Sequence, residues 1–288
     1  MREAANPNAK EEAGAAVESR SCAESKPHIA GASTRPGTRS LTRGIKVLRM
    51  VASRPGTGWR LSDLATACNE DRATVHRVLS RLVDERLVRQ RLDDRHYLPG
   101  PMLFELGLAL PEHSQFRRSA ETILRVFAHE MTCVAMLLLR SGDDFVCTVR
   151  EGSALHTGTM MHPGTRRPLI TSAGGVAILQ ALPKLETERI VAENTEREIM
   201  KHGTGRLAGL QRMRERSAQH GMGLNLGDLV PHSFAYSLPV RNHADEAFAA
   251  VVITGKPEQF PESNIDELRM KLRRIADALE IESAVLEA

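Results

Sequence analysis

Between residues 61 and 82 the apolar positions recur at helical spacing in two short runs, and a polar break separates these runs. The first run places Leu61, Leu64 and Ala65 on one helical face. The second run follows the i, i+3, i+4, i+7 pattern of a helix that packs on one side, with Val75, Val78, Leu79 and Leu82. The pattern therefore predicts two short helices joined by a tight turn.

The residues of the break suit such a turn. Asn69 is preceded by Cys68 and followed by Glu70, and asparagine is one of the few residues besides glycine that tolerate a left-handed backbone. Asp71 then stands where an N-cap is expected for a second helix that begins at Arg72.

The second predicted helix is divided into an apolar face and a polar face. A recognition helix needs this division, because one side packs on the core while the other meets base edges and phosphates near the helix N-terminus. The candidate DNA contacts on this helix are Arg72, Ala73, Thr74, His76, Arg77, Ser80 and Arg81. Spacing alone leaves the alternative open that this is an ordinary surface helix with its charges outward.

The flanking segments favour the DNA-binding interpretation. Upstream, residues 41–53 repeat apolar residues at helical spacing and suit a supporting helix. Downstream, residues 87–91 and 96–98 are predicted as short strands around an Asp-rich turn at 92–95, which is a hairpin signal. Three helices and a basic hairpin follow the order of a winged helix-turn-helix, so Arg95 on the hairpin joins the candidate DNA contacts.

The charge distribution agrees with this interpretation. Residues 40–100 carry 12 Lys and Arg and 7 Asp and Glu, whereas residues 101–288 carry 21 and 24. The positive excess lies in the segment predicted to meet phosphates, where it supplies sequence-independent affinity. Residues 1–39 show no apolar periodicity and have a composition typical of a disordered tail.

After residue 100, helical and strand-like runs are mixed without regular alternation. We expect a linking helix over 102–110, and further helices over 115–131, after Ser172, and over 185–193, 207–220 and 265–281. Strands are expected over 133–140, 145–150, 155–161, 222–226, 234–240 and 248–254. This order favours an α+β fold with a mainly antiparallel sheet.

Several other functions are not supported by the residues. No apolar run is long enough for a secretory signal or a bilayer span, so we expect no membrane partner and a cytoplasmic location. The scattered cysteines favour free thiols, with a redox-sensing pair left open: Cys22, Cys68, Cys133 and Cys147. No GxSxG, GxGxxG or P-loop sequence occurs, so neither an enzyme nor a cofactor is predicted. The histidines show no HxxxH or HExxH spacing on one helix, so no metal is predicted, although ligands can assemble across loops.

Taken in order, several stretches of the chain resemble the IclR family of bacterial transcription regulators. They are SLTRGIKVLRMVA at 40–52, ATVHRVLSRLVDERLV at 73–88, YLPG at 97–100, HPGTRRPLITSAGGVAIL at 162–179 and SLPV at 237–240. The resemblance covers about residues 40–285. It implies a DNA-binding domain at 40–100 behind the tail, a linker helix at 101–113, and a GAF-like effector-binding and oligomerisation domain at 114–288. It also implies dimers or tetramers on pseudopalindromic operators in double-stranded DNA, with a small organic acid or aromatic metabolite as the signal.

The chain departs from the family pattern in two places. The family usually has Gly-Leu before the recognition helix, whereas this chain has Asn69-Glu70, so an acidic residue replaces an apolar contact near the DNA. We expect the usual architecture with a slightly altered approach to the groove. The second departure lies in the pocket, where related proteins often have an acidic residue, a Cys and two Ser. By position these are replaced here by Asn225, Ala235, Val252 and Thr254.

The remainder of the predicted effector site is the start of the helix after Ser172. Ser172 can cap this helix, while the small residues Ala173, Gly174 and Gly175 leave its first amides accessible to a carboxylate. The residues fit equally well an alternative in which the glycines only permit close helix–sheet packing, and the resemblance favours the ligand. Because hydrogen-bonding groups have been lost, we expect an effector that is less hydroxylated and more apolar than glyoxylate or pyruvate, such as an aromatic carboxylate.

The sequence thus predicts a homo-oligomeric, effector-responsive transcription regulator. The main alternative is a constitutive DNA-binding protein whose C-terminal domain only oligomerises. A second alternative, an enzyme or interaction module with a DNA-binding anchor, is disfavoured because no catalytic constellation is found.

Overall fold

The computed structural model describes residues 38–152 and 161–287, and its first part contains three helices and a hairpin. Helix α1 spans Thr38–Ala52, α2 spans Leu61–Cys68 and α3 spans Arg72–Asp84. Strand β1 (Val88–Gln90) pairs antiparallel with β2 (Tyr97–Pro99). The predicted order of three helices and a wing is therefore confirmed.

The apolar stripe of α3 forms much of the core of this first part. Val75 and Leu79 are buried, and they pack with Val51 of α1 and Leu64 of α2. Burying a side chain of this size contributes about 1.5–3 kcal/mol, so the stripe holds α3 in place and directs its polar face outward.

The predicted linking helix is shorter in the structure. Helix α4 spans Met102–Gly107, and α5 begins earlier than predicted and spans Pro111–Glu130. Proline suits the first turn of a helix, because it lacks an N–H that would have no partner there and its φ angle is already helical. For this reason α5 begins at Pro111 and not near residue 115.

The second part is built on a six-stranded sheet with the order β5-β4-β3-β8-β7-β6, and every neighbouring pair is antiparallel. The strands are β3 (Val134–Ser141), β4 (Asp144–Glu151), β5 (Arg166–Pro168), β6 (Gly223–Leu226), β7 (Phe234–Arg241) and β8 (Ala247–Gly255). The predicted α+β fold is confirmed. Strand β5 was not predicted, because Arg-Arg-Pro has no strand signal. The strand predicted over 155–161 lies, except for its last residue, outside the described residues.

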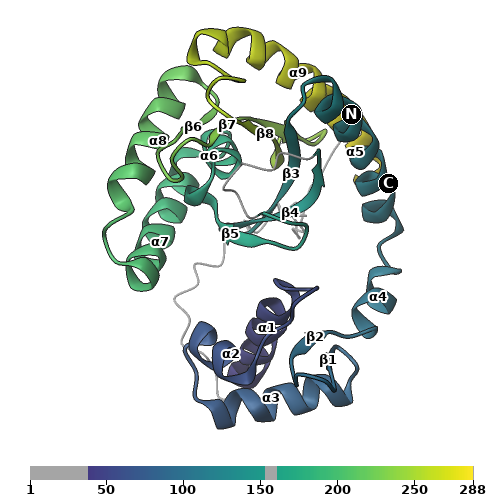
Figure 1. Ribbon diagram of the computed structural model, residues 1–288. Helices are drawn as coiled ribbons and strands as arrows, with labels where there is room; N and C mark the ends of the chain where they lie inside the picture. The colour runs from purple at the N-terminus through teal and green to yellow at the C-terminus, as the bar shows by residue number, and fades with distance from the viewer. Residues whose placement is uncertain (1–37, 153–160, 288) are drawn as a thin grey trace, which may run out of the picture. The chain divides into compact units, whose positions relative to one another are not determined.

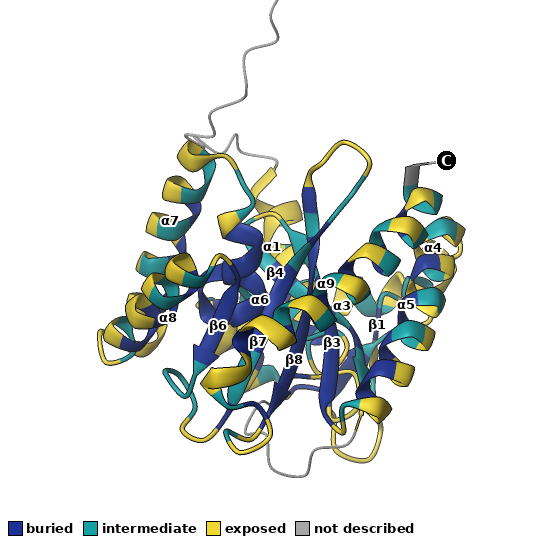
Figure 2. Cartoon of the chain, turned by 90° about the horizontal axis from the view of Figure 1, so that it is seen from above, coloured by how far each residue is buried: buried dark blue, intermediate teal, exposed yellow. Residues whose placement is uncertain are grey.

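Helices cover both faces of this sheet (Figure 1). Helices α5 and α9 (Ile265–Glu282) pack on one face. Helices α6 (Ala173–Gln180), α7 (Lys184–His202) and α8 (Leu207–His220) belong to the other side. Figure 2 shows the central strands β3 and β8 as buried between the two layers. Short 3-10 turns at Leu169–Thr171, Glu262–Asn264 and Ser283–Glu287 complete the described chain.

Helix α7 is longer than the predicted helix over 185–193. In the additional turns the buried positions include two polar residues, Asn194 and Glu198. Because the prediction followed apolar residues at helical spacing, it ended the helix before these positions. Among the helices of the described ranges, none has the length and apolar character needed to cross a membrane.

Candidate DNA interface and effector site

The candidate DNA contacts on α3 lie on one continuous face of the helix. Thr74 is partly buried, and the others are exposed: Arg72, Ala73, His76, Arg77, Ser80 and Arg81. The predicted N-cap is confirmed, since Asp71 Oδ1 accepts a hydrogen bond from the backbone N–H of Thr74 at 2.8 Å. This hydrogen bonding holds the pKa of Asp71 below its usual value. The N-terminus of α3 is thus fixed while its polar side chains face outward.

The side chains on this face differ in how free they are to meet DNA. Ser80 donates its hydroxyl to the backbone oxygen of His76 at 3.0 Å, so only its acceptor lone pairs remain. Arg77 donates to Thr74 Oγ1 at 3.3 Å, which places its guanidinium near the start of the helix. Arg81 pairs with Asp84 at 3.3 Å, and both side chains are largely exposed, so this pair is weak and easily exchanged for a phosphate.

The turn before α3 explains how the chain accommodates its unusual sequence. Asn69 has φ 48° and ψ 52°, the left-handed conformation that was predicted. The carboxylate of Glu70 pairs with Arg43 Nε of α1 at 3.0 Å. The acidic residue in the turn is therefore paired with a cation of α1.

The wing turn is stiffened by a set of contacts that the sequence analysis missed. Arg91 makes two hydrogen bonds to Asp94, at 2.9 and 2.6 Å, and His96 Nδ1 lies 2.7 Å from the same carboxylate. The Arg91 guanidinium holds the pKa of Asp94 well below its usual range. Arg95 has φ 59° and an exposed side chain, so the turn presents this cation outward. The signal was the close interleaving of Asp, Arg and His at 91–96, which was used only as a turn signal.

The sheet register brings the pocket residues from β6, β7 and β8 together. Asn225 is opposite Ala235, and Ala235 is opposite Thr254, so these three side chains form one row across three strands. Val252 belongs to the next row, opposite Ser237. The rows lie on the face of the sheet that carries α6. The predicted effector residues therefore lie on the same side of the sheet, either on its strands or at the start of α6. They are separated by up to 82 positions in the sequence, between residues 172 and 254.

The start of α6 is capped and tightly packed. Ser172 Oγ accepts the N–H of Gly175 at 3.0 Å, which confirms the predicted cap. A Cβ on Gly175 would lie 1.9 Å from the backbone oxygen of Leu169, and a Cβ on Gly174 would lie 2.6 Å from Val252 Cγ2. Close packing against the backbone therefore requires Gly175, and side-chain packing favours glycine at 174, so their presence by itself gives no argument for a ligand. Ala173 is likewise buried.

Two polar side chains of the row, Thr254 and Asn225, are buried on the side of the sheet that carries α6. Thr254 is 1% exposed, and its Oγ1 has no hydrogen-bond partner in the described part of the chain. Asn225 is 9% exposed, and its Oδ1 accepts the N–H of Asp228 at 3.0 Å. An unsatisfied buried hydroxyl costs about 1–3 kcal/mol, which a ligand atom at this position would recover.

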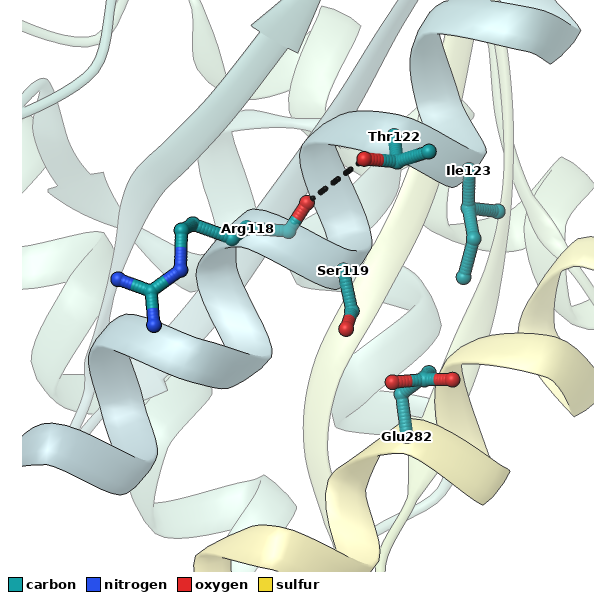
Figure 3. Close-up of a pocket in the computed structure, with 5 residues that line it drawn as sticks. All are labelled: Arg118, Ser119, Thr122, Ile123 and Glu282. Carbon is teal, nitrogen blue, oxygen red and sulfur yellow. Dashed lines mark hydrogen bonds between the residues drawn. The ribbon is translucent and has the colours of Figure 1, made fainter.

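A shallow depression elsewhere on this part of the molecule contains none of the predicted residues. It lies between α5 and α9, on the opposite face of the sheet, and Figure 3 shows its lining: Arg118, Ser119, Thr122, Ile123 and Glu282. The hydroxyl of Thr122 donates to the backbone oxygen of Arg118 within the helix. Within residues 38–152 and 161–287, no group of three or more His, Cys, Asp or Glu is arranged to hold a metal ion.

Comparison with known proteins matches two family models to this chain. The IclR helix-turn-helix domain matches residues 40–92, and the bacterial transcriptional regulator IclR C-terminal domain matches residues 110–281. The probable transcriptional regulator SauR of Cupriavidus necator is 24% identical over 211 residues, which are 73% of this chain and 83% of SauR.

Two solved structures share the fold. An IclR family transcriptional regulator from Brucella abortus has a TM-score of 0.64 and 22% identity over 83% of this chain and 90% of its own. An IclR homolog from Microbacterium hydrocarbonoxydans, complexed with 4-hydroxybenzoate, has a TM-score of 0.62 and 16% identity over 85% of this chain and 99% of its own.

Proposed function

The chain belongs to the IclR family of bacterial transcription regulators, and we propose that a small organic carboxylate, aromatic in character, modulates its binding to an operator. The family consists of DNA-binding regulators and not of enzymes. We propose the division into a domain at 40–100, a linker at 101–113 and an effector domain at 114–288. We also propose dimers or tetramers on pseudopalindromic operators, as the family resemblance implies.

On the DNA side, the proposal assigns base and phosphate contacts to the exposed face of α3 and to Arg95 on the wing. Its support is that one short, well-capped helix presents several exposed cations and hydrogen-bonding groups on a single face. Arg77 near the helix start is proposed to read a guanine edge, and Arg81 to contact phosphate.

On the effector side, the observation that carries the proposal is the unpartnered Thr254 Oγ1. A fully buried hydroxyl without a partner loses its water and gains nothing in return, so a ligand atom that bonds to Thr254 Oγ1 would stabilise this position. Ala235 beside it adds apolar surface, which suits a carboxylate with an apolar or aromatic body. It supports an effector-responsive domain over a constitutive regulator whose C-terminal domain only oligomerises.

The DNA proposal is tested by fluorescence anisotropy with a labelled duplex from upstream of the chain's own gene and a scrambled competitor, at several salt concentrations. Saturable binding that survives the competitor and weakens steeply with salt supports it. Arg77→Ala is expected to cost about 1–3 kcal/mol of discrimination between the two duplexes. Arg118→Ala, on α5, is the matched control. If Arg77→Ala weakens binding to both duplexes equally, the guanine-reading role is wrong.

The effector proposal is tested by thermal shift with aromatic carboxylates and with the small 2-oxo acids pyruvate and glyoxylate. Stabilisation by the aromatic acids is expected, and Thr254→Val, which removes the hydroxyl but keeps the shape, should reduce it. Stabilisation by the 2-oxo acids alone would refute the aromatic assignment. If no acid of either class stabilised the chain, the constitutive alternative would be favoured.

A further inference from the structure

Asp228, in the turn after β6, is a buried carboxylate held by helix α8. Its side chain is 4% exposed, and Arg216 Nη1 lies 2.6 Å from its Oδ2. Arg212 Nε lies 3.6 Å from its Oδ1. A buried carboxylate persists only when cations and hydrogen-bond donors compensate for the loss of water, and α8 supplies two such cations.

The backbone around Asp228 is fixed as closely as its side chain. Asp228 Oδ2 accepts the N–H of Leu226 at 3.3 Å, which ties the carboxylate to the end of β6. A Cβ on Gly209 of α8 would lie 2.5 Å from the Asp228 backbone oxygen, so the helix packs directly on this turn. Helix α8 therefore determines where the backbone N–H of Asp228 points.

That N–H is the partner of Asn225. It donates to Asn225 Oδ1 at 3.0 Å. A side-chain amide has one acceptor oxygen and one donor nitrogen, so fixing the oxygen also fixes the direction of the Nδ2 donor. Asn225 stands in the same row as Ala235 and Thr254, on the face that carries α6.

We propose that Asp228 is a positioning residue: clamped by Arg212 and Arg216, it orients the Asn225 amide so that Asn225 serves the effector site as a hydrogen-bond donor. The effector then places a carboxylate or carbonyl oxygen at Asn225. The inference rests on the proposed function for its ligand, while the orientation of Asn225 is a property of the protein alone.

A double-mutant cycle on the full-length chain tests the ligand part. The probe is 4-hydroxybenzoate, measured by titration calorimetry with the wild type, Asp228→Asn, Asn225→Ala and the double variant. Asp228→Asn is expected to weaken binding roughly tenfold, the scale of one hydrogen bond to a charged group. In the Asn225→Ala background the same change should have less than about a twofold effect, because its route of action is gone. Asp245→Asn, at an aspartate with an 85% exposed side chain in the β7–β8 turn, is the control.

If the losses from Asp228→Asn and Asn225→Ala simply add, Asp228 only supports the fold and the proposal is overturned. Thermal unfolding of each variant checks that the chain is folded at the titration temperature.

Hydrogen exchange of single backbone amides tests the orientation without any ligand. Asn225→Ala, which removes the acceptor, should accelerate exchange at the amide of residue 228. Asp228→Ala, which removes the clamped carboxylate, should accelerate exchange at residues 226 and 228. If the wild type does not bind the probe, the proposed effector class fails, yet faster exchange at residue 228 in Asp228→Ala still supports the positioning role. Unchanged exchange there overturns it.

Discussion

The exposed face of α3 and the buried row on β6, β7 and β8 are two sites built in opposite ways. The α3 face comes from one helix of 13 residues, and its polar groups point to solvent. The buried row takes one side chain from each of three strands, and its polar groups are 9% exposed or less. The first site needs only a stable helix, whereas the second needs the correct register of three strands.

This difference has a physical consequence for how each site fails. Exposed side chains on a helix can be changed singly with small effects on stability, because water replaces their contacts. Buried side chains between a helix and a sheet have no such freedom, since neighbouring atoms fill the space. Substitutions on the exposed face of α3 should therefore leave the free energy of unfolding nearly unchanged. Substitutions around α6 should change it.

The largest expected effect comes from removing the core support of α3. Leu79 is fully buried, so Leu79→Ala should lower the free energy of unfolding of the helix-turn-helix by about 2–5 kcal/mol. Trp59, the only tryptophan in the chain, lies in this core, so its fluorescence follows this part during urea unfolding. An unchanged Trp59 transition would show that α3 does not depend on its apolar stripe.

A comparable change at α6 adds atoms instead of removing them. Gly175→Ala places a methyl group 1.9 Å from the Leu169 oxygen, so the sheet part should lose about 1–3 kcal/mol or more, measured by circular dichroism. Gly44→Ala in α1 is the matched control: nothing lies within 4 Å of its Cβ, and the helix should gain up to about 1 kcal/mol. Equal effects of the two substitutions would contradict the packing argument.

The two N-caps sharpen the comparison through pH. Ser172→Ala should destabilise by about 1 kcal/mol at every pH, because the hydroxyl does not titrate. Asp71 has a lowered pKa in the folded state, so its cap stabilises at pH values above about 3.8 and this contribution is lost as pH falls through the lowered value. Asp71→Asn keeps a capping oxygen and should flatten the acid side of the stability curve, followed by Trp59 fluorescence. If the stability of Asp71→Asn varied with pH in the same way as that of the wild type, the charge of Asp71 would have no role in the cap.

The smallest effect at neutral pH concerns the buried thiols. Burial raises the pKa of Cys133 and of Cys147 to about 12, and it also raises the pKa of Cys68, where the charge of Lys46 opposes the rise. In a Cys22→Ser chain, reaction with a disulfide reagent at pH 8 should be slow, with Cys68 reacting first. Because an unfolded thiol ionises near 9, the stability supplied by these groups is lost as pH rises from about 9 towards 12. Fast labelling of Cys147 in the native protein would contradict its burial.

The sequence was sufficient to predict the structure of the exposed α3 face because the determinants of this face are local. The spacing of Val75 and Leu79, the cap at Asp71 and the left-handed Asn69 each depend on a few neighbouring residues, and all three are confirmed. The contact roles of individual side chains stay predictions, since DNA geometry decides them.

The buried row on β6, β7 and β8 was predictable only in outline, because its residues are distant in sequence. The resemblance supplied the positions of Asn225 and Thr254, but no local pattern indicates that they share a row. The clamp on Asp228 was missed because Arg212 and Arg216 lie on a helix that carries many charges. The close packing of Gly174 and Gly175 could not be predicted from sequence, because the atoms that they approach belong to residues distant along the chain or to another turn.

The brief strand β5 bears on how copies of this chain can associate. Among the strands of the described residues it is the outermost on its side of the sheet, and it consists of Arg166, Arg167 and Pro168. A strand this short, with two cations and a proline that lacks an N–H, is a poor template for adding a strand from another molecule. Aggregation by joining sheets edge to edge is thus disfavoured at β5.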